Sequence, residues 1–173
     1  MKPVVVIGGG PAGSVFSAIL ASEGIPVMLF ERGAHPRHHV GESLQPATID
    51  ILEQHLGVRE AIAAEDFALK YGAVYVWGET DEPWSILFDE RLERDVDSIT
   101  EEEMLARDYE RAWQVRRSRF DEIIFNAAVA KGVQAHTNTG VAKVLFEDDR
   151  AVGVILDDGR QIDASFVVDA SGQ

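Results

Sequence analysis

Three glycines and one acid near the start of the chain have the types and spacing needed to hold a dinucleotide. Gly8, Gly10 and Gly13 follow the apolar run at residues 4–7. In this pattern the first glycine permits a tight turn, the second lets a pyrophosphate approach the backbone, and the third lets a helix lie close to a strand. Glu31 comes eighteen residues after Gly13, where a carboxylate can accept hydrogen bonds from both hydroxyls of an adenosine ribose. These residues predict a dinucleotide site.

The elements that must position these groups lie in the same segment. Residues 4–7 are β-branched and predict a strand, and residues 27–30 predict a second strand that ends at Glu31. Between them, Pro11 suits the first turn of a helix, where its missing N–H costs nothing. The expected helix has an apolar stripe at Ala12, Val15, Phe16, Ile19 and Leu20, and Gly24 follows it. Its amino end would direct free N–H groups and a positive dipole toward the phosphates.

Composition limits the class of protein. The chain has 173 residues, 46% of them apolar and 27% charged, which is typical of one globular domain with a core. Its net charge of −14 argues against a nucleic acid or an anionic membrane surface as partner. It has no cysteine, so disulfides, iron–sulfur clusters and thiolate zinc sites are excluded. It lacks a membrane span and a signal peptide, so we expect a cytoplasmic protein with no stable membrane association.

The middle of the chain is less regular. Residues 31–46 are rich in Gly, Pro and His and predict a loop, and residues 47–56 predict a short helix closed by Gly57. Residues 73–77 and 84–88 predict a two-stranded ribbon. Residues 90–110 carry nine acids against three arginines, and Thr100 with Glu103 could cap a brief helix there. We interpret that window as a solvated excursion.

Regular patterns return in the last third. Residues 112–116 predict a strand, and Ser118 with Asp121 predicts a helix start ahead of a stripe at Phe120, Ile123, Ile124, Ala127 and Ala128. Residues 141–146, 151–156 and 161–164 predict a β-meander. The expected parallel strands are 3–7, 27–30, 133–136 and 166–169. Because the chain stops directly after the last of these four strands, we expect a piece of a longer protein.

Several separate stretches resemble flavin-dependent halogenases and their close relatives among FAD-dependent monooxygenases. The match to the family covers nearly the whole chain. The WG-x-x-x-x-PW pattern is similar to that of the branch acting on phenols and pyrroles. The stretches that carry the resemblance are GGGPAGS at 8–14, FER at 30–32, PRHHVGESLQP at 36–46, VWGETDEPW at 76–84, WQVRRSRFDEIIFNAA at 113–128 and VVDASG at 167–172.

The resemblance implies a fold and a division of the chain. The fold class is α/β, a Rossmann-type FAD-binding domain of the glutathione-reductase kind, with a β-meander crossover and an inserted β-ribbon, incomplete at its carboxyl end. The nucleotide-binding core would comprise residues 1–71 and 112–173, and residues 72–111 would begin a substrate-side insertion. Two later segments of the family, a Trp-x-Trp-x-x-Ile stretch and a Gly-Asp stretch, do not occur in these residues.

The resemblance also implies roles for single residues toward FAD. The glycine turn and helix start (Gly8, Gly10, Pro11, Ala12 and Gly13) would hold the pyrophosphate, and Glu31 the ribose. Arg32 would pack by the adenine, and Arg37 and Gly41 would lie near the flavin. Arg117 would make a cofactor or interlobe contact. Asp169 and Gly172 belong to the turn that closes the FAD site.

Lys70 is the candidate catalytic residue. It lies twenty-nine residues after Gly41, just before YGAVYVWG, where halogenases of this type place a catalytic lysine. In such enzymes reduced flavin and O₂ convert chloride to hypochlorous acid. An ammonium can hydrogen-bond that acid, or an amine can capture it as a chloramine, and direct electrophilic chlorine to an electron-rich ring. The alternative is an exposed lysine at the entrance to a strand.

The sequence gives weaker support to three other candidate sites. His35, His38 and His39 lie close together, but no carboxylate or thiolate at ligand spacing joins them, so we expect a solvent-facing loop and no metal. Trp77 and Trp84 could line an aromatic substrate pocket or be core aromatics of the ribbon. A hydrolase triad of Ser43, Asp121 and His136 is rejected because the nucleophile elbow is missing.

Three functions remain open at this point. The first is an FAD-dependent halogenase acting on a phenol or pyrrole, free or bound to a carrier protein, with a separate flavin reductase as partner. The second is a related flavoenzyme, an aromatic hydroxylase or an enzyme of the geranylgeranyl reductase kind. Single-component hydroxylases usually end the last strand with Asp-Gly, whereas here Asp169 is followed by Ala-Ser-Gly. The third is a non-catalytic lobe that presents half of an FAD site.

Overall fold

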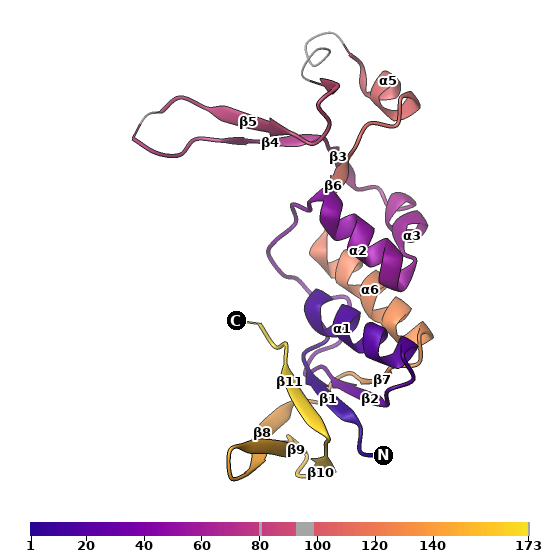
Figure 1. Cartoon of the computed structure of the whole chain (residues 1–173), viewed down its shortest axis with the longest axis vertical. Coiled ribbons are helices and arrows are strands. Elements are labelled where there is room, and N and C mark those ends of the chain that lie inside the picture. The colour runs from indigo at the N-terminus through magenta and orange to yellow at the C-terminus, as the bar shows by residue number, and fades with distance from the viewer. Residues whose placement is uncertain (80, 93–98, 173) are drawn as a thin grey trace.

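The computed structural model describes residues 1–79, 81–92 and 99–172. The described part stacks a helical layer, a parallel sheet and a β-meander, and a two-stranded ribbon projects beyond the helices (Figure 1). In chain order the elements are β1 (Val4–Ile7), α1 (Pro11–Ser22), β2 (Val27–Phe30), α2 (Pro46–Leu56), α3 (Arg59–Ala63), β3 (Ala68–Lys70), β4 (Gly72–Tyr75), β5 (Trp84–Leu87), α5 (Glu101–Ala106), β6 (Ala112–Gln114), α6 (Arg117–Ala130), β7 (Gln134–His136), β8 (Val141–Glu147), β9 (Arg150–Leu156), β10 (Gln161–Asp163) and β11 (Phe166–Asp169).

The central sheet has four parallel strands in the order β11-β1-β2-β7. Val4 and Val6 of β1 face the helices, whereas Val5 between them faces the meander. Because side chains alternate along a strand, the continuous apolar run at residues 4–7 supplies both faces of a sheet that is covered on both sides. The sheet therefore joins two separate hydrophobic cores, and the fold is α/β as predicted.

The helices α1, α2 and α6 pack together on one face of the sheet (Figure 1). Helix α1 buries small residues, and the apolar stripe predicted for it is confirmed only in part: Val15 and Leu20 pack against the core, whereas Ala12 and Phe16 are exposed. Small side chains on the buried face let α1 lie against β1. The buried residues of α1 are Gly13, Ser14, Ser17 and Ala18.

Two further helix predictions have different outcomes. Helix α2 buries Ile49, Leu52 and Leu56 as predicted, and it ends at Gly57 in the left-handed conformation with φ of 67°. Helix α6 begins at Arg117, so the helix start predicted at Ser118 with Asp121 is confirmed to within one residue, although no side chain caps it. Asp121 instead pairs with Arg117 one turn away.

The meander β8-β9-β10 covers the other face of the sheet, where β9 packs against β11. Its three strands match the predicted segments to within one residue at most ends. Val154, Leu156 and Ala164 form the second core with Val5 and Phe30.

Two small sheets lie beyond the helices, and one of them contains β3, a strand that sequence patterns missed. Strand β3 pairs antiparallel with β6, and β4 pairs with β5 to form the ribbon. Neither α3 nor β3 was predicted, because segments of five and three residues are too short for a periodic pattern to appear. Residue 80, in the turn of the ribbon, lies outside the described residues.

The acidic window at residues 90–110 is only partly a solvated excursion. Leu92 and Tyr109 are buried, although the residues around them are mostly exposed. Thr100 and Glu103 form the predicted capping pair at the start of α5, since Glu103 accepts from the Thr100 N–H and its own N–H donates to the Thr100 hydroxyl. Residues 93–98 of this window lie outside the described part of the chain.

Candidate functional site

A cavity of about 470 Å³ opens at the carboxyl ends of the parallel strands, where ligands bind in open α/β sheets. It lies between the glycine turn after β1, the end of β2, the start of β8 and the turn after β11. Its volume is within the range of about 300–1,000 Å³ found for ligand pockets. Its lining residues are Ile7, Gly8, Phe30, Glu31, Arg32, Arg37, His39, Gly140, Val141, Ala142, Lys143, Val144, Asp157, Asp169, Ser171 and Gly172.

The three glycines of the turn differ in what surrounds them. Gly8 has φ of 101°, and a Cβ on it would lie 2.5 Å from the carbonyl oxygen of Ala170. A Cβ on Gly13 would lie 2.0 Å from the carbonyl oxygen of Gly8. A Cβ on Gly10 would meet nothing closer than Arg37, at 3.9 Å. The fold itself therefore requires Gly8 and Gly13, whereas the space beside Gly10 remains open and fits a pyrophosphate at the amino end of α1.

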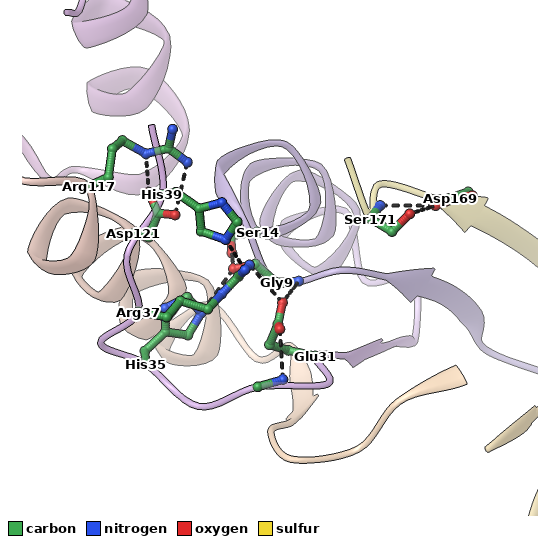
Figure 2. A network of polar contacts seen from close by, with 11 residues as sticks. Gly9, Ser14, Glu31, His35, Arg37, His39, Arg117, Asp121, Asp169 and Ser171 are labelled. Atoms are coloured by element: carbon green, nitrogen blue, oxygen red, sulfur yellow. Dashed lines mark hydrogen bonds and ion pairs between the residues drawn. The ribbon is translucent and has the colours of Figure 1, made fainter. Parts of the chain in front are cut away.

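Glu31 is the centre of a buried polar network (Figure 2). Its carboxylate accepts hydrogen bonds from the Gly9 N–H at 2.8 Å and the Gly33 N–H at 2.9 Å, and it pairs with the Arg37 guanidinium at 3.0 Å. The Gly9 carbonyl lies 3.1 Å from Nε2 of His35. This network ties the loop after β2 to the glycine turn, so the acid predicted to hold a ribose also fixes the shape of the turn.

Two ionisable groups of this network have shifted pKa values. Burial raises the pKa of Glu31, but hydrogen bonds from the Gly33 and Gly9 N–H groups and the charges of Arg37 and His35 outweigh burial, so the pKa is lowered overall. Burial and the neighbouring Arg37 lower the pKa of His39, whose Nε2 contacts that guanidinium. At neutral pH, Glu31 is therefore an anion and His39 a neutral ring that accepts from Arg37.

Arg117 organises a second part of the site. It forms a two-pronged ion pair with Asp121, at 2.7 and 3.0 Å, and Asp121 is almost completely buried. Its Nη1 also donates to the carbonyl of Val40, and a Cβ on Gly41 would lie 2.9 Å from that nitrogen. Arg117 thus joins α6 to the loop at residues 40–41, on the far side of the glycine turn from the 470 Å³ cavity.

The turn after β11 is held by its own side chains. Asp169 accepts from the hydroxyl of Ser171 at 2.6 Å and from its N–H at 3.0 Å, and these two bonds lower the pKa of Asp169 (Figure 2). Gly172 has φ of 75°. The turn places a fixed carboxylate at the edge of the cavity.

Lys70 is buried, with only 7% of its surface exposed, so the alternative of an exposed lysine was wrong. It is the last residue of β3, which sequence patterns did not predict. Its Nζ donates to the hydroxyl of Ser43 at 2.8 Å and to the carbonyl of Leu44 at 3.0 Å, and it lies 5.0 Å from the centre of the Phe88 ring. Burial lowers the pKa of Lys70. The structure places this lysine beside the loop that follows Gly41, away from the 470 Å³ cavity.

The predicted site residues thus fall into groups. Gly8, Glu31, Arg32, Arg37, Asp169 and Gly172 line the cavity. Gly10, Pro11, Ala12 and Gly13 form the adjoining helix start, Gly41 and Arg117 lie together at the loop, and Lys70 lies beyond them. Sequence reasoning missed the lining residues His39, Asp157, Ser171 and those at 140–144. Gly140 lies directly before a predicted strand, and this glycine could have indicated the lining residues at 140–144.

The remaining histidine and aromatic candidates are placed only in part as predicted, since His38 is exposed but His35 is not. His35 does not face solvent, because its ring packs on Phe125 with ring centres 4.7 Å apart. Trp77 and Trp84 are exposed, at 79% and 47%, so neither is a core residue of the ribbon. Within residues 1–79, 81–92 and 99–172, no group of three or more His, Asp or Glu side chains is arranged to hold a metal ion. None of the helices described is both long and apolar enough to span a bilayer.

Comparison with known proteins gives the site a context. A family model described as FAD binding domain matches residues 1–173. The chain is 34% identical over 175 residues to a tryptophan 2-halogenase of Chondromyces crocatus, covering 98% of this chain and 30% of that protein. It is 35% identical over 187 residues to a 1H-pyrrole-2-carbonyl-[peptidyl-carrier protein] chlorinase of Pseudomonas fluorescens, covering 98% of this chain and 39% of that protein.

Solved structures of related proteins also match this chain over nearly its whole length. The myxobacterial chondrochloren halogenase superposes with a TM-score of 0.81 at 37% identity, covering 99% of this chain and 37% of that one. A flavoprotein/dehydrogenase from Cytophaga hutchinsonii superposes with a TM-score of 0.75 at 30% identity, covering 98% and 39%. The chain therefore spans about a third of the length of the proteins that it matches.

Proposed function

The chain belongs to the FAD binding domain family, and we propose that it forms the FAD-binding part of a flavin-dependent halogenase. The relatives that support this proposal include halogenases for tryptophan and for a carrier-bound pyrrole. The whole protein would be an oxidoreductase that halogenates an electron-rich aromatic ring of the phenol or pyrrole type, free or carrier-bound, and would receive reduced flavin from a separate reductase. Residues 1–71 and 112–173 would form its nucleotide-binding core, and residues 72–111 the start of its substrate side.

The observation that carries the proposal is the buried lysine beside the predicted flavin loop. Burial of Lys70 with two acceptors for its Nζ, Ser43 and Leu44, gives it a fixed position. A surface lysine has no reason to be held in this way. The same loop runs from Arg37 and Gly41, which are predicted to lie near the flavin, to the contacts of the lysine.

The residues of this chain would share the work as follows. The glycine turn and α1 would hold the pyrophosphate, Glu31 the ribose, Arg32 the adenine, and Asp169 and Gly172 the closing side of the site. Bound FAD would supply the reduction of O₂ that oxidises the halide. Lys70 would donate a hydrogen bond to the oxygen of hypochlorous acid, so that chlorine bonds to ring carbon while the oxygen leaves as water with the displaced ring proton.

The test is halogenation by the complete protein that contains this chain. With a phenol or pyrrole substrate, a flavin reductase and NADH, FAD, O₂ and chloride or bromide, we expect the halogenated substrate by mass spectrometry. Lys70→Ala should lower the rate by about a hundredfold or more while FAD stays bound, since a positioned proton donor contributes about that much. A product that is only hydroxylated, or no product with either halide, would overturn the proposal.

A second candidate function, a related flavoenzyme that does not halogenate, is favoured by the similarity to a flavoprotein/dehydrogenase. It makes a different prediction for the reductive half-reaction. Rapid bleaching of bound FAD by NADPH without a reductase, followed in a stopped-flow spectrometer, would support this second candidate. Slow bleaching by NADPH and fast turnover with the reductase would exclude it.

A further inference from the structure

Lys70 and the segment at residues 42–44 lie on opposite edges of one short strand. Strand β6 pairs with β3 along one edge, where Lys70 is directly opposite Ala112. Along the other edge the Val115 N–H donates to the Glu42 carbonyl and the Leu44 N–H donates to the Trp113 carbonyl, so Ser43 is opposite Gln114. Strand β6 therefore joins the lysine to the loop in one small three-stranded unit.

The side chain of Lys70 crosses this unit to reach Ser43. Residues directly opposite each other in a ladder share a face, as do residues two apart on one strand. Lys70, Ala112, Gln114 and Ser43 are consequently on the same face of the unit. Ala112 is fully buried and has only a methyl group, which leaves room for the lysine stem to pass over β6 to the Ser43 hydroxyl at 2.8 Å.

We propose that Ser43 is a positioning residue for Lys70: its hydroxyl fixes the lysine nitrogen in the orientation needed for halogen transfer. This inference rests on the proposed function of Lys70. An ammonium has three N–H donors, and Ser43 and Leu44 accept two of them, which leaves the third for a substrate atom. The Leu44 carbonyl can only accept, whereas the Ser43 hydroxyl can accept from an ammonium or donate to a neutral amine. A neutral amine keeps two N–H donors, so both contacts can persist, but of the two only the Ser43 hydroxyl can also donate to the lone pair of the neutral nitrogen.

Charged neighbours do not replace this contact. Glu42, Arg111 and Asp89 are the charged residues next in sequence to Ser43, Ala112 and Phe88. Glu42 accepts from the Gly41 N–H, Asp89 pairs with Arg91, and Arg111 pairs with Asp108. In the part of the chain that the structure describes, none of them forms an ion pair with Lys70, whose lowered pKa has burial as its cause. The two hydrogen bonds and the contact with the Phe88 ring are thus the main interactions that favour the ammonium.

The experiment compares Ser43→Ala, Ser43→Thr and Ser43→Cys in the complete protein. Loss of a hydrogen bond to a charged group should lower kcat of Ser43→Ala about tenfold with little change in KM for the aromatic substrate. Because the lost bond favours the ammonium, the pKa of Lys70 should fall and the pH–rate profile should move to lower pH. Ser43→Thr keeps the hydroxyl, so its kcat and its pH–rate profile should match those of the wild type. Ser22→Ala, at an exposed position at the end of α1, is the matched control and should change neither.

A measurement independent of activity decides the inference. In protein labelled with ¹³C and ¹⁵N in lysine, the Nζ and Cε signals of Lys70, assigned by their loss in Lys70→Arg, should titrate at lower pH in Ser43→Ala than in the wild type. An unchanged titration would overturn the role of Ser43 even if halogenation is observed. If no halogenation occurs in the wild type, the proposed function fails, and the titration still tests the contact. Should Ser43→Ala not fold, Ser43→Cys, with similar volume and a weaker acceptor, must show the same direction.

Discussion

At the scale of single residues, the ribose contact proposed for Glu31 competes with its contacts inside the chain for the same oxygens. A carboxylate offers about four acceptor sites, and the Gly9 N–H, the Gly33 N–H and Arg37 already use three of them. One ribose hydroxyl can therefore bind to the remaining site, whereas a second requires one present donor to move. Arg37 is the donor that can leave most readily, because it is a flexible side chain and its guanidinium also contacts His39.

The charge of Glu31 predicts a pH-dependent stability. Its pKa in the folded chain lies below the ordinary value of 4.5, so its contribution is present above pH 4.5 and is lost as the pH falls through the lowered value. Glu31→Gln should lower the free energy of unfolding by about 1–3 kcal/mol at pH 7, and the difference from wild type should shrink at lower pH. Urea unfolding at several pH values between 7 and 3 measures it.

The matched control is Glu23→Gln at an exposed position, which should stay within about 0.5 kcal/mol of wild type throughout. A constant difference between Glu31→Gln and wild type over this pH range would contradict the role given to the carboxylate charge. The same variant should also bind FAD more weakly, by roughly tenfold or more, if the acid holds the ribose.

At the scale of elements, the glycines of the short turn between β1 and α1 have two different roles. The fold requires Gly8 and Gly13, whereas Gly10 leaves space for the proposed pyrophosphate. Gly8 lies against the turn after β11, and Gly13 lies against Gly8, so both contacts are internal to the fold. The space beside Gly10 is open instead. Strand β6 has a comparable linking role, because it holds Lys70 on one edge and the loop at residues 42–44 on the other.

This difference predicts opposite behaviour for two alanine variants. Gly13→Ala should destabilise the chain by about 1–3 kcal/mol, because its Cβ would lie 2.0 Å from backbone oxygen. Gly10→Ala should lower the free energy of unfolding by less, at most about 1 kcal/mol for a poorer helix cap, and yet weaken FAD binding, because its Cβ fills the space for the pyrophosphate. Denaturant unfolding and FAD titration measure the two effects. Normal FAD affinity in Gly10→Ala would show that the pyrophosphate lies elsewhere.

At the scale of the whole molecule, the layered core contrasts with the projecting ribbon. The sheet is covered by helices on one face and by the meander on the other. The ribbon, by contrast, exposes Val74, Val76, Trp77, Trp84 and Ile86. Apolar side chains gathered in this way are typical of a surface that meets another surface. Tyr75 and Trp84 stack on each other with ring centres 4.7 Å apart, which stiffens the ribbon without covering it.

The exposed ribbon predicts self-association of the 173-residue chain. The double variant Val74→Thr/Trp77→Ser should reduce light scattering and the apparent mass in solution, and should leave the free energy of unfolding within about 0.5 kcal/mol, since both side chains are largely exposed. Phe146→Ser, an exposed aromatic on the meander, is the control and should leave association unchanged. An equal fall in association for Phe146→Ser would mean that the ribbon has no special part in it.

Patterns in the sequence predicted the elements whose physics is local. The glycine turn, the two strands beside it, the helix at Pro46–Leu56 and the meander are all present, because their apolar periods and turn residues act within a few positions. The buried face of α1 was predicted only in part, because close packing against a strand selects small residues there rather than the largest apolar ones. The start of α6 was predicted to within one residue, although Asp121 pairs with an arginine instead of capping the helix.

The sequence by itself determined the cofactor class, since the spacing of Gly8, Gly10, Gly13 and Glu31 is a property of one continuous segment. Only the tertiary structure decided that Lys70 is buried against Ser43, and that residues at 140–144 close the cavity beside Glu31. The physical reason is separation along the chain: these groups meet only after strands distant in sequence pair. No local preference for helix, strand or turn encodes such a pairing.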